Sequence, residues 1–206
     1  MTETLIIFSR YPEAGKTKTR MIPALGAVGA AQLQQEMTEH TLTTAKKLSD
    51  TAGNVSLEVH FAGGNRQLME QWLGKDINYF PQVAGDLGAR MQLAFAAAFD
   101  NKSDRVVIIG IDCPDINLKI LNLAFTGLKK HDLVLGAAED GGYYLIGLSR
   151  LIPELFCNIN WGTSVVFQQT KTIANNLKLS IDYLPVFRDV DRPEDLATWQ
   201  KYQKKS

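Results

Sequence analysis

The fold is decided near the start of the sequence by LIIFSRYPEAGKTKTRM, residues 5–21. Its first four residues are apolar and predict a β-strand. The strand runs into a loop that carries four cations within eleven residues, Arg10, Lys16, Lys18 and Arg20. Gly15 in this loop permits a positive φ or the close approach of a ligand. α/β proteins bind phosphate with loops of this kind, and the alternative is a solvated basic loop.

The composition is that of a globular protein without a strong overall charge. Its 206 residues fit one domain spanning residues 1–206, and 22 Lys and Arg balance 22 Asp and Glu. We therefore expect neither a nucleic-acid nor a membrane-surface partner. No run of 18 apolar residues and no signal-peptide pattern is present, so we expect no membrane span. Cys113 and Cys157 lack metal-ligand and disulfide patterns, which indicates a cytoplasmic protein. The oligomeric state is left open.

Strand-like and helical segments alternate along the chain. Pro23 is expected to delay the first helix, whose periodicity runs from Gly26 to Ser49. Residues 105–111 form the most apolar run of the chain, and residues 106–109 within it are continuously apolar, as in a central strand covered on both faces. The Asp- and Gly-rich turn at residues 139–142 predicts a hairpin. We expect further strands at 55–61, 77–80, 133–138, 143–148 and 181–186, and helices at 65–73, 91–100, 117–128 and 164–177 and from 192 onward. This alternation predicts an α/β fold with a largely parallel sheet.

Three polar loops each follow a predicted strand, at residues 10–20, 112–115 and 139–142. Ligands of open α/β sheets bind beyond the carboxyl ends of the strands. Three loops at one edge of the sheet are stronger evidence for a site than any single motif.

Acidic side chains follow two of the strands. Asp112 ends the most apolar run, where an unpaired buried carboxylate is costly. A divalent ion on diphosphate oxygens requires hard carboxylate ligands, and Asp112 is the first candidate, ahead of Asp115. The alternative for Asp112 is a helix cap or an ion pair with the first loop. Asp189 and Asp191 form a second acidic group, either as a metal contact or as caps of the last helix.

The turn at residues 139–142 contributes Asp140, Gly141 and Gly142. The glycines permit close approach of a sugar or phosphate, and Asp140 is suited to bind sugar hydroxyls or to accept a proton. An ordinary Asp-Gly turn is the alternative. Trp161-Gly162-Thr163 offers an aromatic wall and a hydroxyl, or a core tryptophan.

The segment after residue 85 and the end of the first loop each allow a second interpretation. Asp86 and Arg90 either line the nucleotide or only begin a helix. Gly15-Lys16-Thr17 mimics the end of a Walker A loop. The first glycine of that motif would fall on Arg10, and Pro23 interrupts the helix that a P-loop requires. A P-loop NTPase is therefore disfavoured.

Six motifs in order resemble those of one bacterial family. They are PEAGKTKTRM at 12–21, GDLGARM at 85–91, GIDCP at 110–114, EDGGYYLIG at 139–147, WGT at 161–163 and DVDRPEDL at 189–196. They are similar to motifs of glycosyltransferase-like proteins described as radical-SAM/selenodomain-associated transferases, some of which are linked to arsenosugar biosynthesis. Met21 stands where leucine is commoner in that family.

The resemblance implies the nucleotide-diphospho-sugar transferase (GT-A) fold, with three layers and a mostly parallel mixed sheet. Relatives of that family include molybdenum-cofactor nucleotidyltransferases and 2-phospholactate guanylyltransferases. The resemblance implies that Lys16, Lys18 and Arg20 contact phosphates, and that Mg2+ or Mn2+ lies near Asp112 with help from Asp191. The further candidate binding residues are Arg10, Gly15, Asp86, Arg90, Gly141 and Gly142.

Three functional hypotheses follow. The first is glycosyl transfer from a nucleotide-diphosphate sugar to an unidentified small acceptor, with Asp112 and Asp140 as catalytic residues. The second is nucleotidyl transfer from a nucleoside triphosphate to a phosphate-bearing acceptor. The third is nucleotide binding without turnover. The basic loop suits the second hypothesis and the family resemblance favours the first.

Overall fold

The computed structural model describes residues 2–203, which form one seven-stranded sheet with helices on both faces. In chain order the elements are β1 (Glu3–Arg10), a 3-10 helix (Thr19–Met21), α1 (Ile22–Ala52), β2 (Val55–Ala62), α2 (Arg66–Leu73), β3 (Asn78–Pro81), α3 (Leu87–Asp100), β4 (Arg105–Ile109), α4 (Leu118–Gly127), β5 (Leu133–Ala138), β6 (Tyr143–Leu148), a 3-10 helix (Pro153–Phe156), α5 (Val166–Asn176), β7 (Ile181–Phe187), a 3-10 helix (Pro193–Asp195) and α6 (Leu196–Gln203).

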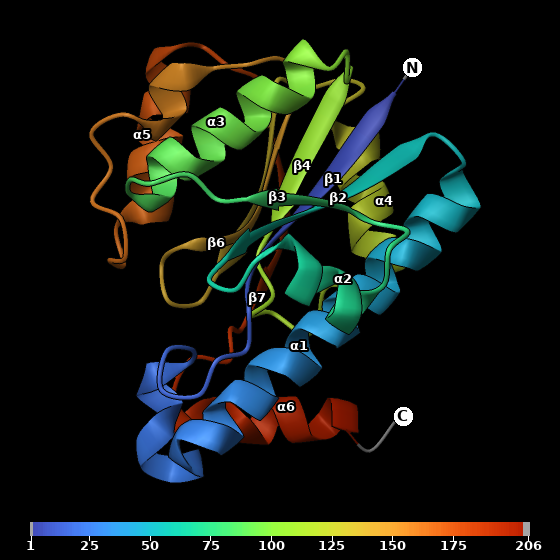
Figure 1. The fold of residues 1–206 in the computed structure, drawn as a ribbon. Coiled ribbons are helices and arrows are strands. Elements are labelled where there is room, and N and C mark those ends of the chain that lie inside the picture. Colours follow the sequence, from blue (N-terminus) through green and yellow to red (C-terminus); the bar gives the residue numbers. More distant parts are fainter. Residues whose placement is uncertain (1, 204–206) are drawn as a thin grey trace.

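The strand order across the sheet is β3-β2-β1-β4-β6-β5-β7 (Figure 1). All neighbouring strands are parallel except β6, which is antiparallel to both β4 and β5. The predicted α/β class and the hairpin at residues 139–142 are confirmed. The strands β2 and β4 pair with opposite edges of β1. The strand order of the sheet therefore reverses between β1 and β4. Crevices for ligands form at such reversals.

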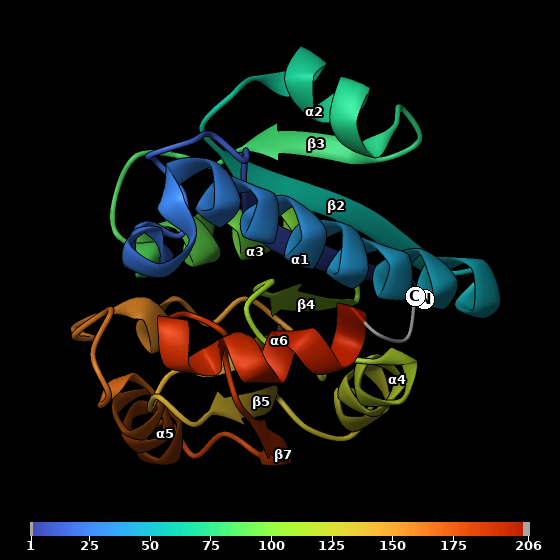
Figure 2. The ribbon, with the colours of Figure 1, turned by 90° about the horizontal axis from the view of Figure 1, so that it is seen from below.

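Two apolar cores cover the two faces of the sheet. Helices α1, α4 and α6 pack on one face, and α3 and α5 pack on the other (Figure 2). The central strand β4 sends Val107 and Ile109 into the first core and Val106 and Ile108 into the second. A strand whose residues are buried on both faces requires an uninterrupted apolar run. The expected central position of the run at residues 105–111 is confirmed, although the strand itself ends at Ile109.

The start of the first long helix differs from the sequence-based expectation. The helix α1 begins at Ile22, so Pro23 lies in its first turn instead of delaying it. Proline is tolerated there because the first amide groups of a helix have no intrahelical partner. Gly26 has non-helical angles (φ 69°, ψ 169°) and kinks the helix. The regular helix beyond Gly26 is the predicted one.

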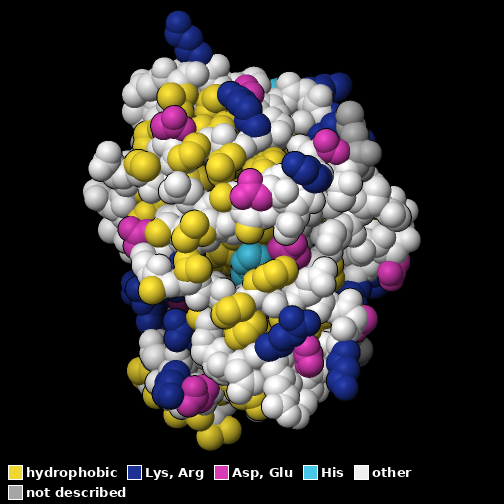
Figure 3. Space-filling view, turned by 45° about the horizontal axis from the view of Figure 1, so that its top comes forward, with side chains coloured by type: hydrophobic (Ala, Val, Ile, Leu, Met, Phe, Trp, Pro, Cys, Tyr) yellow, Lys and Arg dark blue, Asp and Glu magenta, His cyan; other side chains and the backbone are white. Residues whose placement is uncertain are grey.

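One face of the molecule carries apolar side chains around a histidine (Figure 3). The His60 ring lies 5.7 Å from the Phe8 ring and 5.1 Å from the Phe80 ring, measured between centroids. Phe80 is exposed, and Val83 and Leu87 continue the exposed apolar surface toward α3. Apolar surface therefore runs from the β3 edge to the start of α3.

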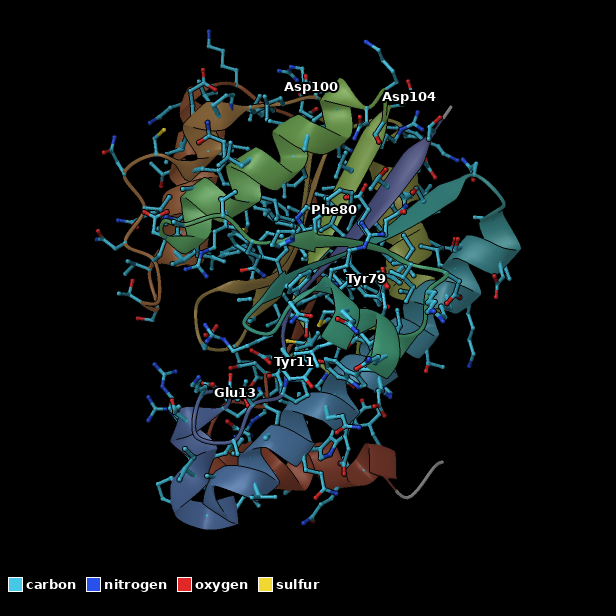
Figure 4. The ribbon with its side chains drawn as sticks, in the orientation of Figure 1. Tyr11, Glu13, Tyr79, Phe80, Asp100 and Asp104 are labelled. Atoms are coloured by element: carbon cyan, nitrogen blue, oxygen red, sulfur yellow. The ribbon has the colours of Figure 1, made fainter. Side chains whose placement is uncertain are left out.

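The first loop lies at the carboxyl end of the strands. In the view of Figure 4, Asp104, just before β4, lies near the top, and Glu13 of this loop lies at the lower left. The side chains of Tyr79 and Phe80 mark β3 between them. Within residues 2–203, no helix has both the length and the apolarity needed to cross a membrane.

Candidate functional site

The first loop is anchored to the neighbouring strand β2. The Tyr11 amide donates to the carbonyl of Ala62 at 2.9 Å, which extends the β1–β2 pairing by one residue. The Tyr11 ring packs edge-on against Trp72 and fills the space beside Gly64, where a Cβ atom would stand 2.7 Å from Tyr11 Cγ. The start of the loop is therefore fixed by packing.

Local contacts shape the turn that follows. Gly15 has a φ of +80°, which favours glycine, and no heavy atom lies within 4 Å of its Cβ position. The carbonyl of Glu13 accepts from the Lys16 amide at 3.0 Å and from Thr17 Oγ1 at 3.2 Å. Thr17 is buried, and Lys18 takes the left-handed conformation with a φ of 46°. The turn directs Lys18 toward the neighbouring strand ends.

Lys18 joins the first loop to two other segments. Its Nζ donates to Asp112 Oδ1 at 2.7 Å and to the Val190 carbonyl at 2.5 Å. The Lys18 side chain is only 4% exposed, whereas that of Asp112 is 50% exposed. The ion pair, an alternative for Asp112 that the sequence left open, is therefore present.

Arg20 forms a second connection. Its guanidinium donates to Asp191 Oδ2, and this hydrogen bond raises the pKa of Arg20, with smaller contributions from the charges of Asp140 and Asp189. The Val190 amide also donates to the Asp112 carbonyl at 2.8 Å. The loops after β1, β4 and β7 thus form one connected edge of the sheet.

A cleft of about 560 Å³, which we name the basic cleft, opens along this edge. Among the described residues its charged lining side chains are five cations, Arg10, Lys16, Lys18, Arg20 and Arg90, and two carboxylates, Asp112 and Asp191. The structure therefore brings together every cation that the sequence nominated. An excess of cations in a cleft attracts phosphates and raises the rate at which they bind.

Sequence reasoning missed the two glutamines of this cleft. Gln34 is buried and donates to the Arg10 carbonyl at 3.1 Å, while Gln82 donates to the His60 carbonyl at 2.9 Å. Arg90 Nη1 in turn donates to Gln82 Oε1 at 3.4 Å. The position of Gln82 directly after β3 is a signal that could have found it, because ligands bind beyond strand ends. Gln34 lies within α1 and gives no such signal.

Asp86 does not line the basic cleft. Its Oδ1 accepts from the Ala89 amide at 2.8 Å and caps the amino terminus of α3. This is the second of the two roles that the sequence left open for Asp86. A direct contact of Asp86 with nucleotide stays a prediction.

A second cleft of about 470 Å³ adjoins the first, and we name it the acidic cleft. The two share Arg20 and Asp191. Among the described residues the charged lining side chains of the acidic cleft are three arginines, Arg20, Arg188 and Arg192, and five carboxylates, Glu139, Asp140, Asp189, Asp191 and Asp195. Gly162, Thr163 and Ser164 complete the lining. The two clefts therefore carry opposite excess charge and meet at the Arg20–Asp191 pair.

Burial and neighbouring charges perturb the acids of this edge. Burial, followed by the charge of Asp140, raises the pKa of Asp189. Burial acts against ionisation of Asp195, but hydrogen bonds from Arg188 and from two backbone amides lower its pKa overall. Burial also raises the pKa of the Cys113 thiol well above its usual range, so Cys113 is a core residue without nucleophilic character.

The glycines of the turn at residues 139–142 have structural reasons of their own. Gly141 has a φ of +89°, and a Cβ atom on it would lie 2.1 Å from the carbonyl oxygen of Ser164. The Gly142 amide donates to Asp140 Oδ1 at 2.8 Å. Packing against residue 164 accounts for Gly141, so its contact with a ligand stays a prediction, as does that of Gly142.

The motif at residues 161–163 contacts helix α3. A Cβ atom on Gly88 would lie 2.5 Å from Trp161 Nε1. The Trp161 ring also meets Tyr143 edge-on, with 6.4 Å between ring centroids. The tryptophan therefore connects β6 to the start of α3, while Gly162 and Thr163 of the motif line the acidic cleft.

A metal ion at this edge would need ligands beyond the side chains of residues 2–203. Within residues 2–203 no group of three or more His, Cys, Asp or Glu side chains is arranged to hold a metal ion. Mg2+ bound with nucleotides commonly takes one or two carboxylates and completes its coordination with phosphate oxygens and water. The half-exposed Asp112 carboxylate, with Asp191 beside the same cleft, fits that mode.

Residues 44–163 match a protein-family model whose description is "Uncharacterized protein conserved in bacteria (DUF2064)". The chain belongs to the DUF2064 family. Curated proteins supply no match. A crystal structure from Desulfovibrio desulfuricans, named by inference as a nucleotide-diphospho-sugar transferase, has 33% sequence identity to this family member and a TM-score of 0.91. The match covers 100% of this chain and 90% of that one.

More distant structures share the fold of this DUF2064 protein. A 4-diphosphocytidyl-2C-methyl-D-erythritol synthase from Anaerococcus prevotii has 11% identity and a TM-score of 0.66, with 98% of each chain covered. Rv0371c from Mycobacterium tuberculosis, crystallised in complex with manganese, has 14% identity and a TM-score of 0.58, with 98% and 99% covered. The predicted nucleotide-diphospho-sugar transferase fold is confirmed.

Proposed function

We propose that this protein is a glycosyltransferase that uses a nucleotide-diphosphate sugar as donor. The observation that carries the proposal is the meeting of the basic and acidic clefts at the Arg20–Asp191 pair. A sugar transferred across this boundary would leave its diphosphate in the basic cleft and join an acceptor in the acidic cleft, where carboxylates are in excess. The transferase fold of its structural neighbours is consistent with this reaction class.

The basic cleft binds the donor. Lys16, Lys18 and Arg20 provide charge-assisted hydrogen bonds to the diphosphate, and such bonds are shorter and stronger than neutral ones. The same cations stabilise the negative charge that develops on the departing nucleoside diphosphate. Lys18 is positioned at the cleft by Asp112 and the Val190 carbonyl before the donor arrives.

The acidic cleft receives the acceptor. A phosphate group there would face the carboxylates of Glu139, Asp140 and Asp189, none of which has an ion-pair partner among the contacts of residues 2–203. Like charges brought together cost several kcal/mol, so the acceptor is an unphosphorylated hydroxyl compound. Asp140 accepts the proton of the attacking hydroxyl, because its carboxylate lines this cleft.

A divalent ion fits beside Asp112 and Asp191. Mg2+ or Mn2+ bound there with the diphosphate supplies Lewis-acid stabilisation of the leaving group. Ion pairing of the two carboxylates with Lys18 and Arg20 keeps them in position at the cleft. Manganese in the related-fold Rv0371c structure supports testing Mn2+ first.

Nucleotidyl transfer is the second candidate. Five cations in the basic cleft suit a triphosphate, which carries more charge than a diphosphate. The acceptor of nucleotidyl transfer carries a phosphate, which the excess carboxylates of the acidic cleft would repel. Nucleotide binding without turnover is the third hypothesis, and the association with radical-SAM systems and arsenosugar biosynthesis also stays a prediction.

Product analysis separates these reactions. The protein is incubated with nucleotide-diphosphate sugars or nucleoside triphosphates, Mn2+ or Mg2+, and acceptors supplied as matched pairs with and without a phosphate group. Release of nucleoside diphosphate with an unphosphorylated acceptor supports glycosyl transfer. Pyrophosphate release with the phosphorylated partner would replace it with nucleotidyl transfer. Nucleotide binding with no product from any pair would favour the binding protein.

A further inference from the structure

We propose that the ligand of the basic cleft lies directly against the backbone of Gly110, in the space that a side chain would occupy. Gly110 would then be a binding residue that sets the depth of the cleft. The inference rests on the proposed function in one respect, namely that the ligand is a nucleotide donor. The chain has sixteen glycines, each of which lies within residues 2–203, and Gly110 differs from all the others.

Backbone conformation accounts for most of the other glycines. Nine of the sixteen have a positive φ, a conformation that residues with a side chain rarely adopt. They include Gly15 and Gly141 of the candidate site. Gly110 is not among them, so its backbone would accept any residue without strain.

Packing accounts for the glycines that remain. A Cβ atom on any of the other six would approach a heavy atom to 3.1 Å or less, as at Gly88 beside Trp161 and at Gly136 beside Tyr144. A Cβ atom on Gly110 would have no heavy atom within 4 Å. Gly110 is therefore the one glycine that neither the backbone nor the packing of the protein requires.

The empty space at Gly110 belongs to the basic cleft. Gly110 follows the last residue of β4 and lines this cleft together with Ile111 and Asp112. Burial alternates from here onward: Ile111 and Cys113 are core residues, whereas Gly110 and Asp112 are partly exposed. The open space at the Cβ position of Gly110 adjoins the cleft that both of these partly exposed residues line. The missing side chain of residue 110 would therefore project toward the cleft, on the side of Asp112.

The backbone at this point is held on both sides. The Gly110 amide donates to the Tyr144 carbonyl at 3.2 Å, and the Asp112 carbonyl accepts from the Val190 amide at 2.8 Å. An added methyl group would thus remain in the cleft instead of being relieved by movement of the loop. The space is preserved for a group that the protein itself does not supply.

The position of Gly110 indicates which part of the donor it contacts. Two residues of chain span at most about 7 Å, so Gly110 lies close to Asp112 and to the Lys18 ammonium that Asp112 binds. Lys18 belongs to the cationic loop that binds phosphates in the proposed function. The geometry therefore assigns Gly110 to the sugar–phosphate portion of the nucleotide.

The test compares Gly110→Ala and Gly110→Val with the wild type and with Gly29→Ala. Gly29 also has no positive φ but lies in α1, outside the residues that line the basic cleft. Thermal unfolding is measured without ligand. Dissociation constants are then measured by calorimetry for UDP-glucose, GDP-mannose, CTP and GTP, each with Mn2+.

We expect Gly110→Ala to leave the melting temperature unchanged or raised, since alanine restricts the unfolded chain. The Gly110→Ala substitution should raise the dissociation constant of the nucleotide that the wild type binds by about tenfold, because one added methyl group overpacks the site. Gly110→Val should raise this dissociation constant further, and Gly29→Ala should bind the nucleotide with wild-type affinity.

Equal affinity of wild type and Gly110→Ala would overturn the inference and leave the proposed function standing. A lower melting temperature for Gly110→Ala would also overturn it, because the fold would then require the glycine. If Gly29→Ala weakened nucleotide binding as much as Gly110→Ala, the loss of affinity would not be specific to position 110. If the wild type bound no member of the panel, both the inference and the proposed function would be wrong.

Discussion

Lys18 Nζ lies 2.7 Å from Asp112 Oδ1, although 94 residues separate the two in the sequence. The pair connects the loop after β1 to the strand end of β4, at the point where the strand order of the sheet reverses. Each partner neutralises the other without a ligand. A phosphate bound by Lys18 would therefore compete with Asp112, and a cation bound by Asp112 would free Lys18 for the phosphate.

The two cations that join the loops should differ in their effect on stability. Arg20→Ala should weaken nucleotide binding by roughly 1–3 kcal/mol, the scale of a charge-assisted hydrogen bond. Because the Arg20 side chain is 63% exposed, its loss should change the free energy of unfolding by less than about 1 kcal/mol. Lys18→Ala should weaken binding similarly and also destabilise the fold by about 1–3 kcal/mol, since it leaves the buried Val190 carbonyl without its donor.

Calorimetry with nucleotide and chemical denaturation check these two variants. Lys46→Ala is the matched control, because Lys46 forms an ion pair with Asp76 and does not line the basic cleft. Wild-type affinity in Arg20→Ala and Lys18→Ala would remove the first loop from the site.

The dependence of nucleotide binding on a divalent metal should require Asp112. Asp112→Asn should abolish the tightening of nucleotide binding by Mn2+, because a neutral amide is a weaker ligand for a hard cation than a carboxylate. The measurement is the dissociation constant with Mn2+ and with chelator. Asp115→Asn is the control, since the Asp115 carboxylate accepts from the Tyr202 hydroxyl in the fold. Tightening by Mn2+ that persists in Asp112→Asn would place the ion elsewhere.

Gly88→Ala should destabilise the protein through Trp161. The added Cβ atom would stand 2.5 Å from Trp161 Nε1, and overpacking of this kind costs about 1–3 kcal/mol. In the background of Trp161→Ala the clash is absent, so the same glycine substitution should cost much less. Denaturation of both single variants and the double variant gives the coupling energy. Additive effects would show that the two side chains do not interact.

Asp132 should make stability depend on pH. Hydrogen bonds from the Ser180 hydroxyl at 2.7 Å and the Ser180 amide at 2.9 Å, with help from Arg150, lower the pKa of Asp132. A lowered pKa stabilises the fold above the unfolded-state value of about 4, and this stabilisation is lost as the pH falls. The stability difference between wild type and Asp132→Asn should therefore be largest near neutral pH and shrink toward pH ~3. Denaturation across this range checks it, and a constant difference would contradict the assignment.

Much of the fold followed from local patterns. The continuous apolar run at residues 106–109 is typical of a strand between two cores, and the Asp-Gly turn after β5 is typical of a tight chain reversal. The basic loop was recognisable because a strand, a glycine and four cations occur together in 5–21. The expectation that Pro23 delays the first helix is wrong, because proline interrupts a helix interior but is tolerated in a first turn. Which of the two applies depends on the conformation of the preceding turn.

The sequence by itself determined the α/β class, the cationic loop and the strand ends that carry Asp112 and Asp140, because these depend on periodicity and on neighbouring residues. Only the tertiary structure decided that Arg20 pairs with Asp191 across 171 residues, that two clefts of opposite charge meet there, and that Gly88 and Gly141 serve packing. The physical reason is that ion pairs and close packing depend on distance in space, which the order of the sheet sets and no local pattern encodes.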